Sequence, residues 1–177
     1  AQGKTEYLID HANMTGYGQA IIETWYNAAG QATKRTSYTY GMDEITQTVG
    51  DLNPDTGVVT SSTTATFSHD GHGSTRALFG AAAAFLQVFT YTSYGELVAI
   101  HNGTAGIVSG SAANLANIAS AITNILYNSE NVDPRTGFYN FRARWYAANI
   151  GRFLAIDPFV GNPNDPFSFN KNGFVHG

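Results

Sequence analysis

The stretch GFYNFRARWYAANIGRFLAIDP, from Gly137 to Pro158, holds six aromatic residues and three arginines within 22 positions. On a strand, alternate side chains point to opposite faces. One predicted face is apolar and suits a core: Tyr139, Phe141, Ala143 and Trp145. The other face alternates rings with guanidinium groups: Phe138, Asn140, Arg142, Arg144 and Tyr146. A turn at residues 147–151 then leads into a second predicted strand, Arg152 to Ile156.

The arginines of this stretch allow two explanations. Guanidinium groups bind anionic substrates, and they also stack on aromatic rings while donating to carbonyls and carboxylates of their own chain. The first explanation is chemistry on a substrate and the second is architecture. The rest of the chain has to decide between them.

The composition favours a β-rich protein and excludes several classes of partner. The chain has 177 residues, of which 12% are charged and 13% aromatic, with 19 glycines. Ordinary soluble domains are about 25% charged, so this balance suits short strands joined by tight turns in one domain or one section of a larger assembly. A net charge of -4 gives no basic surface for nucleic acid. The absence of cysteine excludes disulfides and thiolate metal sites.

No membrane or targeting segment is expected. The longest apolar run, from Ala77 to Leu86, is about half of the roughly 20 residues that a spanning helix needs. The first residues, AQGKTEYLID, lack the basic and apolar regions of a signal peptide. We expect no membrane span, and we expect no cofactor.

Turn signals recur at the short intervals typical of β-hairpins. Between them, KRTSYTYGM and QVFTYTSY show the period-two alternation of strands. The segments NPDTGVV (Asn53 to Val59) and DPRTGFY (Asp133 to Tyr139) share one frame, Asx-Pro-x-Thr-Gly followed by two apolar residues. In such a frame the Asx side chain starts a turn, proline fixes φ, and glycine supplies a left-handed residue. Two copies of one hairpin device suggest a repeat architecture.

One segment has helical rather than strand periodicity. SAANLANIASAITNIL, from Ser111 to Leu126, places apolar residues at helical spacing and offers Ser111 as an N-cap. With the glycine-rich loop before it, the helix forms a predicted insertion between strands. We expect it to cover a sheet edge or core, and the alternative is docking onto a partner subunit.

The segment from Asp133 to Phe159 closely resembles the Rhs-repeat-associated core signature of Rhs/YD-repeat proteins. FSHDGHGSTRAL (Phe67 to Leu78) and YTSYGEL (Tyr91 to Leu97) are similar to further elements of that family. The signature residues that the resemblance implies are Gly137, Arg142, Arg144, Tyr146, Gly151, Arg152, Phe153, Asp70, Gly73 and Arg76. The chain departs from the pattern at Ala147 and Ala148, where Asp-Pro is usual, and at Thr92, where aspartate is usual.

The resemblance implies an all-β, predominantly antiparallel fold, in which YD-repeat hairpins form a curled sheet or shell segment with one short inserted α-helix. The implied organisation has YD-like hairpins over residues 1–100, the loop and helix insertion over 101–126, and the core signature over 127–177, in one continuous unit. The implied partners are other copies or flanking repeats of the same polypeptide and a C-terminal toxin cargo. The implied location is secreted or on the bacterial cell surface.

Three functions follow as alternatives. The first is a structural segment of a β-sheet shell or self-associating extracellular fibre that encapsulates and delivers a toxin. In the second, the resemblance implies an aspartic autoprotease in which Asp157 and Asp165 share one proton and activate water to release the toxin; otherwise each aspartate simply starts an Asp-Pro turn. The third is a cell-surface module whose exposed rings, such as Trp25, Tyr26 and Phe138, bind glycans or proteins.

A metal site is not expected. His69, Asp70 and His72 lie close together in HDGHG. Two histidines in a glycine-rich turn make a poor site unless distant ligands complete it. We therefore assign no metal ligands.

Overall fold

The computed structural model describes residues 3–13, 15–103, 106–110 and 115–174. The chain divides into two compact units, one of Ala1–Ser68 with Leu78–Leu86 and the other of His69–Ala77 with Gln87–Gly177. Antiparallel strands dominate both units, so the predicted fold class is confirmed. No helix within the described ranges is long and apolar enough to cross a membrane.

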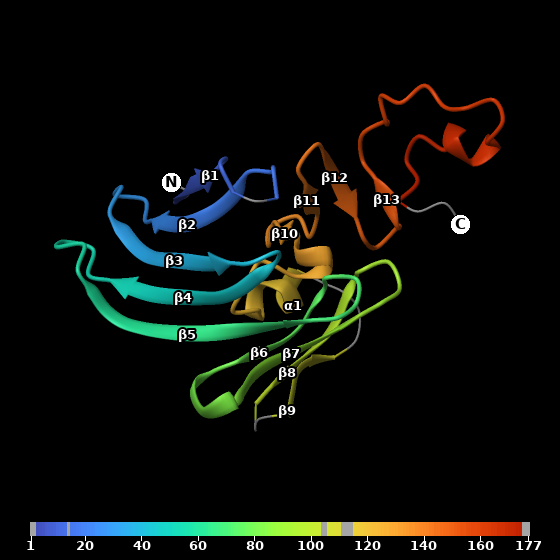
Figure 1. Cartoon of the computed structure of the whole chain (residues 1–177). Coiled ribbons are helices and arrows are strands. Elements are labelled where there is room, and N and C mark those ends of the chain that lie inside the picture. Colours follow the sequence, from blue (N-terminus) through green and yellow to red (C-terminus); the bar gives the residue numbers. More distant parts are fainter. Residues whose placement is uncertain (1–2, 14, 104–105, 111–114, 175–177) are drawn as a thin grey trace. The chain divides into compact units, whose positions relative to one another are not determined.

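The first unit is a series of antiparallel hairpins joined in chain order. Its strands are β1 (Lys4–Asp10), β2 (Gln19–Tyr26), β3 (Ala32–Tyr40), β4 (Glu44–Leu52) and β5 (Val59–His69), each paired with the next (Figure 1). The predicted alternation of β3 is confirmed, since Thr36 and Tyr38 are buried while Ser37 and Thr39 are exposed. A short 3-10 turn, η1 (Ala81–Ala83), also belongs to this unit.

The two copies of the Asx-Pro-x-Thr-Gly frame fold alike. In the first, the Asn53 carbonyl accepts the Gly57 amide at 2.8 Å, and Gly57 has φ +69°. In the second, the Asp133 carbonyl accepts the Gly137 amide at 2.7 Å, and Gly137 has φ +74°. Each Asx side chain also accepts the amide two residues later. The predicted hairpin device is therefore confirmed at both places.

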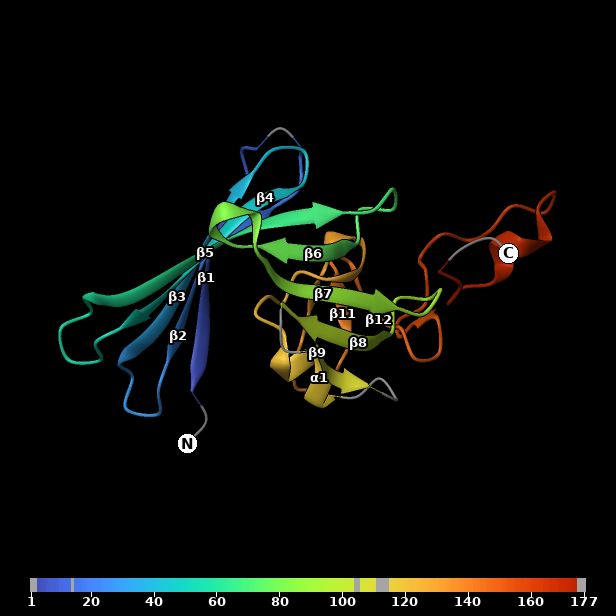
Figure 2. The ribbon, with the colours of Figure 1, turned by 90° about the horizontal axis from the view of Figure 1, so that it is seen from below.

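The second unit contains two groups of antiparallel strands. In the first group, β8 (Leu97–Asn102) pairs with both β7 (Phe85–Tyr91) and β9 (Gly106–Gly110), as Figure 2 shows. The other is a four-stranded sheet of β10 (Asn131–Val132), β11 (Tyr139–Phe141), β12 (Arg144–Ala147) and β13 (Arg152–Phe153). Shorter elements are α1 (Leu115–Ser120), η2 (Tyr127–Ser129) and η3 (Pro166–Phe169). The remaining strand is β6 (Thr75–Phe79), and β5, β6 and β7 each have residues in both units.

The inserted helix is shorter than the sequence predicts. α1 ends at Ser120, and Ser111, the predicted N-cap, lies outside the described residues. The Gln87 side-chain amide donates to the Ser120 carbonyl at 2.9 Å and accepts the Ile122 amide at 2.8 Å. These backbone groups thus bind a side chain of β7 instead of extending the helix. The residues that follow turn inward, and Ile125 and Leu126 are buried in the core.

The prediction of one strand through residues 138–146 is wrong. β11 and β12 are two antiparallel strands joined by a tight turn in which Arg142 has φ +61°. The Asn140 side-chain oxygen accepts the Arg142 amide at 2.9 Å and stabilises this turn. The reversal sets Tyr146 opposite Tyr139 on one buried face and leaves Trp145, a predicted core residue, 44% exposed. The predicted strand from Arg152 to Ile156 is limited to β13.

Candidate functional site

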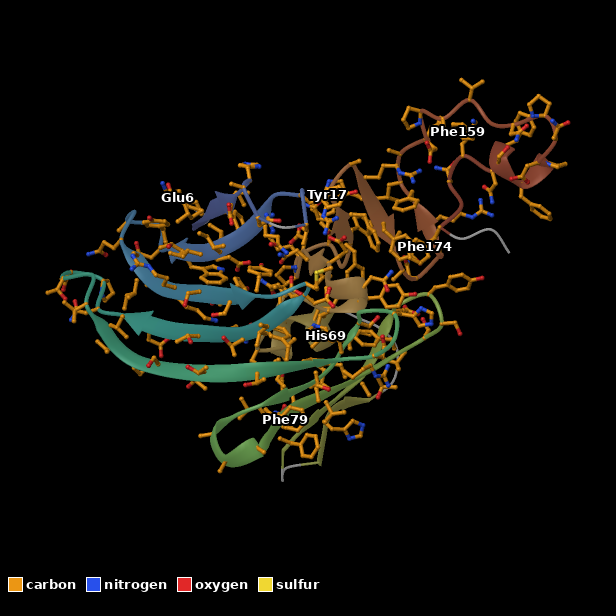
Figure 3. The ribbon with its side chains drawn as sticks, in the orientation of Figure 1. Glu6, Tyr17, His69, Phe79, Phe159 and Phe174 are labelled. Atoms are coloured by element: carbon orange, nitrogen blue, oxygen red, sulfur yellow. The ribbon has the colours of Figure 1, made fainter. Side chains whose placement is uncertain are left out.

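The second unit contains a cluster of aromatic side chains whose rings contact one another. Its seven members are Tyr91, Tyr127, Tyr139, Phe141, Tyr146, Phe153 and Phe174. Ring centroids of neighbours lie between 4.4 Å, for Tyr146 and Phe174, and 6.5 Å, for Tyr139 and Tyr146, with several edge-to-face pairs. Tyr139 is 1% exposed and Tyr146 is fully buried. Phe174, labelled in Figure 3, follows a segment that bonds to β13 through the Asn172 carbonyl and the Phe153 amide.

Three tyrosine hydroxyls of the cluster bind one hairpin turn. Tyr139 donates to the Gly95 carbonyl at 3.0 Å, and Tyr146 donates to the Tyr94 carbonyl at 2.8 Å. Tyr127 donates to the Ser93 carbonyl at 3.2 Å. Burial raises the pKa of Tyr139 and of Tyr146 well above the ordinary value, so both keep their protons and remain donors. Three successive carbonyls of the turn are thus bound by residues more than 30 positions away in the sequence.

The same turn admits no side chain at Gly95. This glycine has φ +86°, and a Cβ placed on it would lie 2.3 Å from the Tyr127 ring. The turn is closed by a bond from the Gly95 amide to the Thr92 carbonyl. The Thr92 hydroxyl accepts the Glu96 amide at 3.1 Å, so threonine performs the capping that aspartate would perform here.

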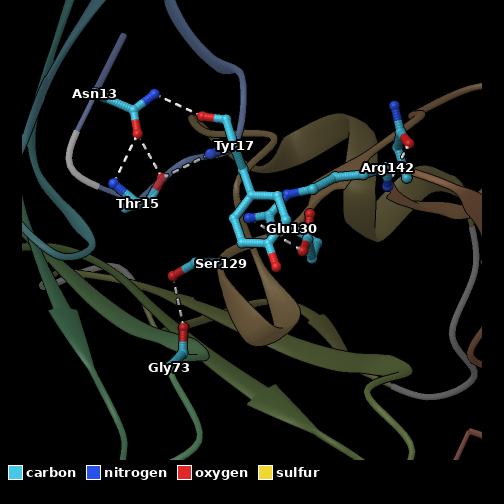
Figure 4. Close-up of polar contacts among 8 residues, drawn as sticks. Asn13, Thr15, Tyr17, Gly73, Ser129, Glu130 and Arg142 are labelled. Atoms are coloured by element: carbon cyan, nitrogen blue, oxygen red, sulfur yellow. Dashed lines mark hydrogen bonds and ion pairs between the residues drawn. The ribbon is translucent and has the colours of Figure 1, made fainter. Parts of the chain in front are cut away.

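A second turn is bound by η2, the segment that also supplies Tyr127. The Ser129 hydroxyl donates to the Gly73 carbonyl at 2.7 Å (Figure 4), and the Asn128 amide donates to the Ser74 hydroxyl at 3.1 Å. Asp70 stabilises the turn from within, since its carboxylate accepts the amides of His72 and Ser74. η2 therefore contacts two hairpin turns that are separate in the sequence.

The residues of η2 adopt an uncommon backbone conformation. Asn128 has φ +52° and Ser129 has φ +54°, in the left-handed region that costs non-glycine residues of order 1 kcal/mol. Their bonds to the Gly73–Ser74 turn compensate for this cost. The conformation is thus tied to the contact with the turn.

The arginines of the opening stretch face groups of their own chain. The Arg144 guanidinium lies 3.7 Å from the centroid of the Phe153 ring and 3.1 Å from the Asp157 carboxylate. Arg142 lies 3.6 Å from the Glu130 carboxylate (Figure 4). This geometry matches the architectural explanation, in which guanidinium groups stack on rings and pair with carboxylates.

The remaining signature residues are spread over the same unit. The Arg76 guanidinium lies 5.6 Å above the Tyr91 ring. Arg152 is exposed at the start of β13. Gly151 has φ +64°, and a Cβ on it would lie 3.0 Å from the ring of Tyr94.

Asp157 and Asp165 each stabilise a local turn. The Asp157 carboxylate accepts the Phe159 amide at 2.9 Å through one oxygen and faces Arg144 with the other. The Asp165 carboxylate accepts the Phe167 amide at 3.2 Å and caps η3. The pairing of these two carboxylates for proteolysis stays a prediction.

Two members of the cluster are absent from the sequence prediction. Tyr127 lies next to the predicted helix, and Phe174 lies beyond the signature, so neither belongs to an alternating strand pattern. Their partners are turns and rings far away in the sequence. The one local signal is that both residues are aromatic.

Comparisons with known proteins give a fold and no family. No protein-family model and no curated protein matches the sequence. Among solved structures, the chain is similar to TcdB2-TccC3 without its hypervariable C-terminal region, with a TM-score of 0.59 and 18% identity over 90% of this chain. It is also similar to TcdB2-TccC3-TEV, with a TM-score of 0.60 and 16% identity over 98% of this chain.

The chain spans 7% and 8% of the lengths of those two structures. At such low identity the likeness concerns the fold. Nearly the whole chain thus has the fold of a small section of the TcdB2-TccC3 structures.

Proposed function

We propose that the chain is a structural segment of an Rhs/YD-repeat protein, in which it builds part of a β-sheet shell or a self-associating extracellular fibre for toxin encapsulation and delivery. The similarity of fold to sections of the TcdB2-TccC3 structures supports a toxin-associated structural role. The resemblance of residues 133–159 to the Rhs-repeat-associated core supports the choice of family.

The observation that carries the proposal is the aromatic cluster bound to the turn at residues 93–95. Three of its hydroxyls donate to turn carbonyls, and Arg144 faces Phe153 and Asp157. These polar groups are therefore engaged with the chain itself, as expected of a unit that holds a sheet in a fixed curvature. A glycan-binding module would instead gather its rings on a solvent-facing surface.

The proposed partners follow from this role. Flanking repeats or other copies of the same polypeptide would continue the sheet, and a C-terminal toxin would be the cargo. The proposed location is outside the bacterial cytoplasm, secreted or on the cell surface. These assignments rest on the family resemblance and are open to the following test.

The natural polypeptide that contains this segment can be imaged by electron cryomicroscopy and treated with protease. We expect a hollow particle with this segment in its wall and a protease-protected cargo. Gly95→Ala would drive a side chain into the Tyr127 ring and expose the cargo, whereas Gly71→Ala, at a glycine with open space around its Cβ position, would not. A separate globular domain on a linker, or a cargo accessible in the unaltered protein, would contradict the proposal.

A further inference from the structure

β1 is the edge strand of the first unit. Within the described ranges it pairs with β2 alone, as Figure 1 shows for the dark blue strand beside β2. The irregularity in this pair belongs to β2, because Leu8 faces Ile22 and Ile9 faces Ala20, which leaves Ile21 as the extra residue. β1 itself therefore has no inserted residue.

β1 has only part of the usual protection of an edge. Natural edge strands are blunted by proline, bulges or charged side chains, and of these β1 has the charges of Lys4, Glu6 and Asp10. The sequence KTEYLID contains no proline, and Leu8 and Ile9 are 54% and 38% exposed. Such a strand is suited to pairing with another strand.

We propose that β1 pairs antiparallel with β1 of a second copy of this chain, around a two-fold axis through Tyr7. In this register Lys4 of each copy lies opposite Asp10 of the other, and Tyr7 lies opposite its own counterpart. The β-branched residues Thr5 and Ile9 also face each other. Opposite charges, aromatic pairs and β-branched pairs are the cross-strand combinations that stabilise antiparallel sheets, and a two-fold contact uses the same patch of both subunits.

The charges of β1 select this register among the alternatives. An axis through Glu6 would set two Glu6 carboxylates opposite each other, and an axis through Leu8 would set Glu6 opposite Asp10. Like charges directly opposite are destabilising. A slip by one residue would join opposite faces of the two sheets. Of the three registers centred on Glu6, Tyr7 and Leu8, the one through Tyr7 pairs opposite charges and opposes no like charges.

This inference deepens the proposed structural role, because it names the surface and the partner for self-association. It can fail without affecting the shell assay. A chain that stays monomeric would overturn the β1 contact, while the location of the segment in a particle wall would still be decided by imaging.

Disulfide cross-linking tests the register directly. The chain has no cysteine, so a single introduced thiol can form a disulfide only between copies. We expect Tyr7→Cys to form a covalent dimer under mild oxidation, because the two positions face each other. Thr5→Cys alone should not, because its two positions would lie four residues apart along the pair, about 13 Å, beyond the roughly 7 Å limit between Cα atoms. A mixture of Thr5→Cys and Ile9→Cys chains should cross-link.

A charge exchange tests the ion pair across the axis. By sedimentation equilibrium we expect Lys4→Asp or Asp10→Lys to weaken dimerisation about tenfold, and the double variant to restore it. Arg135→Glu, which reverses an exposed charge in the second unit, should leave the dimer unchanged.

Three results would overturn the proposal. One is a monomeric chain, and another is equal cross-linking of Thr5→Cys and Tyr7→Cys. The third is a thiol at position 7 that becomes protected in the natural polypeptide without any dimer. In that case a strand of the same polypeptide occupies the edge.

Discussion

Glu23 is a carboxyl group on β2 with no exposed surface. Burial raises its pKa to about 7, and the nearby Tyr38 hydroxyl and Lys34 ammonium oppose this by smaller amounts. The folded state therefore holds a proton that the unfolded chain releases near its ordinary pKa of about 4.3. The resulting stabilisation is complete below the unfolded pKa and is lost as pH rises through about 7.

We predict that the free energy of unfolding falls by about 2 kcal/mol between pH 5 and pH 8 because of this group. Glu23→Gln keeps the shape without the proton, so it should flatten that part of the dependence. Urea denaturation of both proteins across this pH range measures the effect. The contribution of the histidines to the pH dependence is the same in both proteins and drops out of the difference. Parallel curves for the two proteins would show that Glu23 does not titrate near neutral pH.

The Asp133 carboxyl acts outside that pH window. Partial burial raises the pKa of Asp133, and the amide and guanidinium of Arg135 lower it by more, so it lies below the ordinary value. Its stabilisation is present above the unfolded pKa and is lost only as pH falls through the lower folded value. The predicted fall between pH 5 and pH 8 is thus separate from acid unfolding.

At the scale of elements, the sequence correctly predicts strands that bury one face. It does not predict turns whose left-handed residue is neither glycine nor asparagine. The alternation in β3 and the paired Asx-Pro-x-Thr-Gly turns follow from local chemistry. The turn between β11 and β12 cannot be predicted in this way, because its left-handed residue is Arg142 and not a glycine. The end of α1 depends on Gln87, more than 30 residues earlier in the chain.

The aromatic cluster shows the same limit. Alternation places Tyr139 in the core, and the structure confirms it. It places Tyr146 on the opposite face, whereas the hairpin brings Tyr146 next to Tyr139. The turn carbonyls that these hydroxyls bind lie 44 and 52 residues away. A periodicity argument has no access to such long-range contacts.

One substitution can measure how much the hydrogen bond between β12 and the turn at residues 93–95 contributes to the free energy of unfolding. Tyr146→Phe removes the hydroxyl that donates to the Tyr94 carbonyl and keeps the ring in the cluster. We expect a loss of about 1 kcal/mol in the free energy of unfolding, measured in urea, the usual net value of such a bond. Tyr94→Phe is the matched control, because it changes an exposed side chain and keeps the accepting carbonyl. An equal loss in both variants would refute a specific role for the bond.

At the scale of the whole molecule, the question is whether the polypeptide cuts itself. The Asp157 carboxylate is engaged by Arg144 and by the Phe159 amide, as expected of a turn residue. We therefore predict that intact-mass measurement finds a single uncut chain both for the natural polypeptide containing this segment and for its Asp157→Asn variant. Asp165→Asn serves as the parallel variant for the second carboxylate, which caps η3. Two fragments from the unaltered polypeptide and a single uncut chain from Asp157→Asn would contradict this prediction. That result would show that cleavage requires the Asp157 carboxylate, which then has a role beyond stabilising a turn.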